Sequence, residues 1–205
     1  FNANVIRHLN EVVAEYEPKV GRENILIYPV GRKVADAVKK MEGLTAAGDY
    51  QHMSGKPNYQ EAADLAAELM TRFASGEIQQ VELLYNHFKS TSTQVLTRET
   101  YLPLDLSAGH TDEKGEEQEA MQADYLIEPS PEQVMEELLP KVLRMKMYTV
   151  LLDSTASEHA ARTMAMQIAT DNANDLIQEL TLIYNKSRQQ AITNELLDIV
   201  GGSMS

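Results

Sequence analysis

The chain has 205 residues, 43% of them hydrophobic and 24% charged, so it is long and apolar enough to bury a core. Its 31 Asp and Glu residues outnumber its 18 Lys and Arg residues, and the formal net charge of −13 disfavours non-specific binding to nucleic acid or anionic lipid. The absence of cysteine excludes disulfides, thiolate metal sites and thiol regulation. No apolar run approaches the roughly 20 residues that a membrane-spanning helix needs, so direct membrane insertion is not expected.

The first part of the chain alternates predicted helices and strands. Hydrophobic spacing predicts a helix over residues 3–16 that ends before Pro18. A continuous apolar run then predicts a strand over 23–30, covered on both faces, and a helix over 31–42 follows directly. The stretch 43–53 is compatible with either a short strand or a loop.

The next elements complete a mixed α/β order. Apolar residues at helical spacing predict a helix over 59–75, which Gly76 stops. Two strands, 78–90 and 93–106, are joined through a Ser/Thr turn. This order predicts an α/β fold with a small, partly parallel, Rossmann-like sheet and flanking helices.

The last part of the chain is dominated by one long helical stretch. An acidic segment, 107–123, predicts a solvated, mobile loop, and 124–129 predicts one more strand. Ser130 is placed to cap a helix that Pro140 kinks or restarts. The stretch 141–200 contains no proline or glycine and permits about 60 residues of helix, about 90 Å long.

Such a helix must extend beyond a small domain, so we divide the chain into an α/β domain over 1–129 and a helical segment over 130–205. Its small and apolar residues recur with a mean spacing of about 3.7, above the 3.5 of a left-handed coiled coil. The small side chains allow close approach of a second helix, whereas a plain core helix does not explain the length. The predicted helix-pairing stripe consists of Ala165, Ala169, Ala173, Leu176, Leu180, Ile183, Ser187 and Ala191.

The common motifs of nucleotide and metal sites are absent or weak. The stretch "PVGRKVAD" places one glycine between a strand and a helix, which is more typical of an ordinary tight turn than of a nucleotide site. The five histidines have no ligand spacing, and no metal ion or cofactor is expected. These histidines are His8, His52, His87, His110 and His159.

Neither of two candidate catalytic groupings is convincing. Ser157 and His159 are two residues apart and point to different sides of a helix, so they form no triad with Asp153 or Ser154. A surface ion pair between Glu158 and Arg162 is expected instead. The paired carboxylates Glu116 and Glu117 lie in the acidic segment, where nothing fixes their geometry.

The C-terminal quarter contains the most distinctive stretch of the chain, "LLDSTASEHAARTMAMQIATDNANDLIQELTLIYNKSRQQAITNELLDIVGG", residues 151–202, with its Ala-Ser-Glu-His-Ala-Ala-Arg, Ala-Thr-Asp-Asn-Ala and Arg-Gln groups. This stretch closely resembles the terminal helix of the gamma subunit of F-type ATP synthases. Weaker matches, "GRKVADAVKK", "LLYNHFKS" and "LLPKVLRMKMY", follow the family's order, so the similarity covers essentially the whole chain. The chain begins "FNANVIRH" without Met, and the resemblance implies a preceding long helix and first strand that this chain lacks.

The resemblance implies a non-catalytic rotor subunit. In this family the two terminal helices form an antiparallel coiled-coil shaft inside a ring of alpha and beta catalytic-head subunits. The α/β domain lies near the epsilon subunit and the membrane rotor ring of a proton- or sodium-translocating enzyme. The implied location is peripheral, on the cytoplasmic face of a bacterial cell membrane. Without its partner helix, the chain is expected to be able to self-associate.

The same resemblance implies contacts between the helix and the catalytic head. The matching residues are Arg162, Arg188, Gln189, Thr193 and Glu195, with charge-assisted or amide hydrogen bonds as their expected interactions. Gln167 and Gln190 depart from residues common in the family, and the cysteine-bearing chloroplast insertion is absent. The alternative hypothesis is an independent α/β ligand-binding domain or enzyme that dimerises through its terminal helix.

Overall fold

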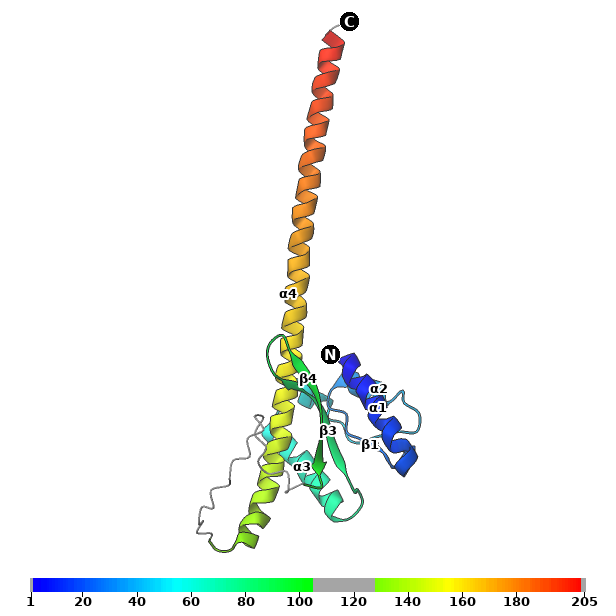
Figure 1. The fold of residues 1–205 in the computed structure, drawn as a ribbon, viewed down its shortest axis with the longest axis vertical. Helices are drawn as coiled ribbons and strands as arrows, with labels where there is room; N and C mark the ends of the chain where they lie inside the picture. Colours follow the sequence, from blue (N-terminus) through cyan, green and yellow to red (C-terminus); the bar gives the residue numbers. More distant parts are fainter. Residues whose placement is uncertain (1, 105–127, 204–205) are drawn as a thin grey trace, which may run out of the picture. The chain divides into compact units, whose positions relative to one another are not determined.

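The computed structural model describes residues 2–104 and 128–203. Its contacts divide the chain into two compact units, Phe1–Ala160 and Ala161–Ser205. The first unit contains the described strands and the hydrophobic core, and the second consists of the continuation of the C-terminal helix (Figure 1). The fold is mixed α/β with small sheets, flanking helices and a long C-terminal helix, as expected.

Helix α1 spans Asn2–Val20 and therefore runs past Pro18, where the sequence predicted its end. Pro18 removes only its own N–H from the last turns, and the following residues still donate backbone hydrogen bonds. The N–H of Gly21 donates to the carbonyl of Glu17 at 3.0 Å. Gly21 has φ 80°, a conformation that favours glycine, and the helix ends there.

A short parallel pair follows α1. After the 3₁₀ turn η1 (Arg22–Asn24), strand β1 (Leu26–Ile27) pairs with β2 (Thr45–Ala46), and α2 (Arg32–Val38) connects them. The expected strand over 23–30 and helix over 31–42 are therefore too long. The pair is short because Pro29 has no N–H to donate to a ladder, and the partly exposed β1 is not the buried strand that was predicted.

The 3₁₀ turn η2 (Gln51–Ser54) leads into helix α3 (Tyr59–Ala74), which confirms the predicted helix. Asn58 caps α3 by accepting a hydrogen bond from the Gln60 N–H at 3.0 Å. The side chains that α3 buries follow helical spacing, as the sequence indicated. They are Ala62, Ala63, Leu65, Ala66 and Leu69.

Strands β3 (Val81–Phe88) and β4 (Gln94–Leu102) form the predicted hairpin. They are antiparallel, with Phe88 opposite Gln94 beside the turn and a register irregularity at Val81/Glu82. Among the described residues this hairpin is a sheet separate from β1 and β2, so the single partly parallel sheet expected from the sequence is replaced by two pairs. The predicted loop over 107–123 and most of the predicted strand over 124–129 lie outside the described residues.

Helix α4 spans Pro131–Ser203, which is 73 residues and about 110 Å. Ser130 caps it as predicted, with its Oγ accepting from the Gln133 N–H at 3.3 Å. The helix continues through Pro140 without restarting, because one missing N–H removes only one hydrogen bond from a long ladder. It also continues past Val200, the last residue of the stretch without proline or glycine.

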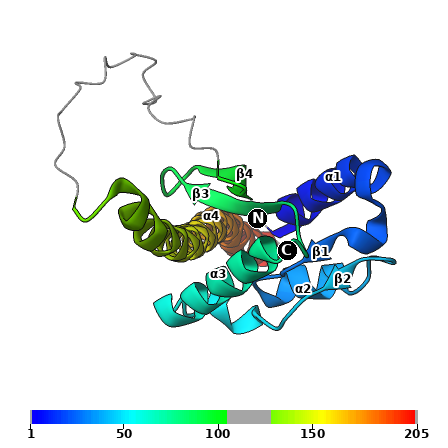
Figure 2. The ribbon, with the colours of Figure 1, turned by 90° about the horizontal axis from the view of Figure 1, so that it is seen from below.

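The core of the first unit forms where α3, the hairpin and the beginning of α4 meet (Figure 2). Tyr101 is buried there, and its hydroxyl donates to the Leu143 carbonyl of α4 at 2.9 Å. Burial raises the pKa of Tyr101 to about 12. The core residues are Met53, Ala62, Leu65, Ala66, Leu69, Tyr101, Leu102, Leu143, Met147 and Leu151. The packing boundary at Ala160 thus lies inside α4, whereas the sequence-based division at residue 130 marks the start of that helix.

Candidate partner-contact surface

The second unit carries the predicted helix-pairing stripe, and all of its residues are exposed. Leu176, Leu180 and Ile183 each keep slightly more than half of their surface accessible, at 55%, 54% and 55%. Ala165, Ala169, Ala173, Ser187 and Ala191 separate or flank these larger side chains. The stripe thus presents apolar and small side chains along one face of a helix, and its pairing with a second helix stays a prediction.

The five predicted contact residues are also exposed, but they do not form one cluster. Arg162 lies about 39 Å along the helix axis from Arg188, at 1.5 Å per residue. Near the C-terminal end, Arg188 and Glu195 are seven residues apart and therefore share a face. Gln189 and Thr193 are four apart on another face of the same turns. The helix therefore offers two contact regions, which suits partners that surround a rod more than a single concave site.

Thr193 uses its hydroxyl proton within the helix. Its Oγ1 donates to the Gln189 carbonyl at 2.8 Å, the i to i−4 bond common for helical threonine. The hydroxyl oxygen keeps its acceptor capacity, and the methyl group remains available for apolar contact. A partner at this position therefore meets an acceptor and a methyl group.

Ser157 and His159 lie on different sides of α4, as predicted. The side chain of Ser157 is completely buried, and its Oγ donates to the Asn86 carbonyl of β3 at 2.8 Å. The side chain of His159 is 68% exposed. Asp153 accepts a hydrogen bond from the Phe88 N–H at 2.8 Å, so Asp153 and Ser157 contact the hairpin and form no triad with His159. The ion pair expected between Glu158 and Arg162 stays a prediction.

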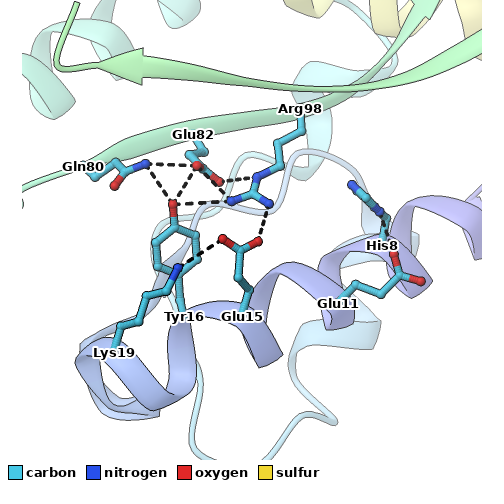
Figure 3. A network of polar contacts seen from close by, with 8 residues as sticks. All are labelled: His8, Glu11, Glu15, Tyr16, Lys19, Gln80, Glu82 and Arg98. Atoms are coloured by element: carbon cyan, nitrogen blue, oxygen red, sulfur yellow. Dashed lines mark hydrogen bonds and ion pairs between the residues drawn. The ribbon is translucent and has the colours of Figure 1, made fainter.

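The first unit also contains a polar network between α1 and the hairpin, which the sequence did not indicate (Figure 3). Arg98 of β4 donates to both carboxylate oxygens of Glu82, at 2.8 and 3.1 Å, and to Glu15 of α1 at 2.7 Å. The Tyr16 hydroxyl donates to Glu82 at 2.7 Å, and Gln80 donates to that hydroxyl at 2.8 Å. The network joins segments more than 60 residues apart in the sequence, which local patterns cannot reveal.

The charges of this network shift several pKa values. Hydrogen bonds to Glu82 and Glu15 raise the pKa of Arg98 far above its ordinary range. Hydrogen bonds from Arg98 and Lys19 hold the pKa of Glu15 below its ordinary value. Burial raises the pKa of Tyr16. Because every charged group is paired with its opposite, the arrangement is suited to fastening α1 and has no poised acid or base.

The remaining surface of the described residues offers little for ligand chemistry. An open hollow of about 670 Å³ lies beside Tyr59 and Tyr148, whose rings meet edge to face at 5.6 Å. Within residues 2–104 and 128–203, no group of three His, Asp or Glu side chains could hold a metal ion. In the same ranges no helix is both long and apolar enough to cross a membrane.

Comparison with known proteins identifies the family. A family model described as ATP synthase matches residues 1–205. The ATP synthase gamma chain of Phocaeicola vulgatus is 69% identical over 205 residues, which is 100% of this chain and 69% of that protein. The gamma chain of Bacteroides fragilis is 58% identical over the same 205 residues, again 100% of this chain and 69% of that one.

A solved structure has a similar fold. It is a chain from the central stalk and c-ring of the Tetrahymena thermophila mitochondrial ATP synthase, with a TM-score of 0.55 and 22% identity. The similarity covers 82% of this chain and 69% of that one. At 22% identity this structural similarity shows a shared fold only. The family model and the two bacterial relatives match the amino-acid sequence itself. On those sequence matches, the chain belongs to the ATP synthase gamma chain family.

Proposed function

We propose that this chain acts as the rotor shaft of a proton- or sodium-translocating F-type ATP synthase and transmits torque between the membrane rotor ring and the catalytic head. The observation that carries the proposal is α4, a single helix of 73 residues whose last part exposes both an apolar stripe and polar side chains. Family membership supplies the context, because the bacterial relatives are named as gamma chains of ATP synthases.

The physical requirements of a shaft are modest. A rotor transmits torque by contact, so it needs length, stiffness and an asymmetric surface, and needs no catalytic side chain of its own. A helix of about 110 Å supplies the length. Pairing of the helix-pairing stripe with a second, antiparallel helix would supply stiffness, because the small side chains allow the two backbones to approach closely.

A shaft must also contact the surrounding subunits, and we propose that polar residues of α4 make these contacts. We assign Arg162, Arg188, Gln189, Thr193 and Glu195 to contacts with the alpha and beta head subunits. The two arginines would donate charge-assisted hydrogen bonds, and Thr193 would accept one. The α/β domain would lie near the epsilon subunit and the rotor ring, with the complex peripheral to the cytoplasmic face of the bacterial membrane.

The test uses the full-length chain assembled with the head subunits. Arg188→Ala and Gln189→Ala should each lower coupled ATP hydrolysis by about tenfold or less, the effect of losing one hydrogen bond to a partner. Gln178→Ala is a matched control, since Gln178 is an exposed glutamine of the same helix outside the assigned set. Unchanged coupling and assembly in both Arg188→Ala and Gln189→Ala would refute the contact assignment.

A further inference from the structure

The end of strand β3 is fastened to α4 by three hydrogen bonds. Ser157 Oγ donates to the Asn86 carbonyl at 2.8 Å. Asp153 Oδ1 accepts from the Phe88 N–H at 2.8 Å, and Asp153 Oδ2 lies 2.6 Å from His87 Nδ1. Asp153 and Ser157 are four residues apart and therefore lie on one face of α4. Two adjacent side chains of the helix thus hold three consecutive residues of the strand.

The hydrogen bond between Ser157 and Asn86 is shielded from water. Ser157 has no exposed surface, and Asn86 keeps only 6% of its surface exposed. Ala160, one turn further along, is also buried. A buried hydroxyl that donates to a buried carbonyl is costly to remove, because the carbonyl is then left without its partner. The small residues of the Ala-Ser-Glu-His-Ala-Ala-Arg motif therefore permit the strand end to sit directly against the helix.

A second attachment lies nearer the start of α4. The Tyr101 hydroxyl donates to the Leu143 carbonyl at 2.9 Å, and Lys146 Nζ lies 2.9 Å from the Glu99 carboxylate. The midpoints of the two attachments are about 16 Å apart along the helix. Two attachments at different heights on α4 keep the hairpin from swivelling on the helix surface, whereas a single attachment would act as a pivot. In Figure 1 the hairpin accordingly runs along this part of α4.

We infer that Asp153 and Ser157 are positioning residues that lock the hairpin to α4, so that the domain and the helix turn together under torque. The inference rests on the proposed shaft function, because only a loaded rotor needs such a lock. It also assigns part of the family motif to a contact inside the chain: Ser157 faces the hairpin, whereas Arg162 of the same motif remains assigned to the head subunits.

The experiment measures ion pumping and ATP hydrolysis by the complete ATP synthase containing the full-length chain, in membrane vesicles. Asp153→Ala and Ser157→Ala each remove hydrogen bonds to the hairpin. Asp153→Asn keeps an oxygen that can accept from the Phe88 N–H. Ser154→Ala, the same substitution as Ser157→Ala at a partly exposed neighbour, is the matched control. Hydrogen exchange at the Phe88 amide reports the attachment directly.

Asp153→Ala should accelerate exchange at the Phe88 amide about tenfold, the effect of losing one hydrogen bond. Both alanine variants should lower the number of ions pumped per ATP at least twofold, and the loss should grow against an established ion gradient because the load on the shaft is then higher. Asp153→Asn and Ser154→Ala should pump as the wild type does. A purely structural role would lower assembly without this dependence on load.

Two different results would refute the role of Asp153 and Ser157 and the proposed shaft function separately. If the alanine variants open the hairpin end, as hydrogen exchange reports, but pump normally against a gradient, the lock is refuted and the shaft function survives. If coupled pumping by the wild-type complex does not depend on this subunit, the proposed function itself fails. Should Asp153→Ala not assemble, Ser157→Ala decides by the same measurements, since it removes only one hydroxyl.

Discussion

Arg98 connects two elements that are far apart in the sequence, and its surroundings set the ionisation of Glu82. Burial alone would raise the pKa of Glu82, but the hydrogen bonds from Arg98 and Tyr16 outweigh burial and lower it. A carboxyl group whose pKa is lower in the folded state adds stability above its unfolded pKa and loses that contribution as the pH falls through the folded value. The attachment of α1 should therefore weaken in acid.

Arg98→Gln tests this at the level of one residue. At pH 7 the variant should unfold at lower urea concentration, with a loss of about 1–3 kcal/mol, because it leaves the half-buried Glu82 charge without its partner. The difference in stability between the variant and the wild type should shrink as the pH falls towards 3. Without Arg98, burial raises the pKa of Glu82 in the variant, so the carboxyl takes up a proton and is no longer an unpaired charge. Urea unfolding between pH 3 and 7 measures both effects.

Lys19→Gln provides the control for this prediction. Lys19 lies at the exposed edge of the same network, where it pairs with Glu15 at 3.2 Å. Exposed ion pairs contribute little to stability, so this variant should follow the wild type at every pH. A constant difference between Arg98→Gln and the wild type across the pH range would contradict the assigned role of Glu82.

At the scale of the element, α4 combines two environments in one helix. Its first part buries Leu143, Met147 and Leu151 in the core of the first unit. Its later part exposes large apolar side chains, among them Leu176, Leu180, Ile183 and Leu182. An exposed apolar stripe of this length marks an interaction surface. We therefore expect the 205-residue chain, studied by itself, to associate with a second copy through the stripe.

Replacing two stripe residues should weaken this association. Leu180→Ser with Ile183→Ser removes apolar surface from the helix-pairing stripe and should raise the dissociation constant at least about tenfold. Leu182→Ser removes one exposed leucine from another side of the helix and should have a much smaller effect than Leu180→Ser alone, which is its matched comparison. Sedimentation equilibrium measures the constants. A strictly monomeric chain with a fully helical, protease-resistant C-terminal end would contradict the prediction.

At the scale of the whole molecule, the core and the part of α4 beyond Ala160 belong to different units. Every residue of the hydrophobic core cluster lies in the unit Phe1–Ala160. A chain ending at Ala160 should therefore keep its fold, with a thermal midpoint within about 4 °C of the parent, the shift that roughly 1 kcal/mol produces in a domain of this size. Circular dichroism and near-ultraviolet spectra provide the measurement.

The matched comparison is a chain ending at Tyr148. It lacks the buried side chains of Val150 and Leu151 and both residues that hold the hairpin, Asp153 and Ser157. It should unfold at a clearly lower temperature or fail to fold, because a buried leucine alone contributes about 2–5 kcal/mol. Equal stability of the two shortened chains would show that the beginning of α4 does not complete the core.

Local sequence determined the elements whose signals are local. The apolar spacing and the Asn58 cap of α3, the paired runs of β3 and β4, and the Ser130 cap of α4 all act within a few residues, and each is present in the structure. The long interval without proline or glycine likewise predicted a long helix, and the exposed stripe was identified from its spacing. The family followed from residues 151–202, a motif-rich segment long enough to be specific.

The tertiary structure alone decided which of these elements meet. The short β1 and β2 pair, the separate hairpin and the network around Arg98 depend on contacts between distant segments, which helix and strand periodicities do not encode. Ser157 illustrates the difference. From the sequence it was a polar residue in an alanine-rich helix, and only the approach of Asn86 turns it into a buried hydrogen-bond donor. Spacing determines which face of a helix a residue occupies, whereas folding determines what that face touches.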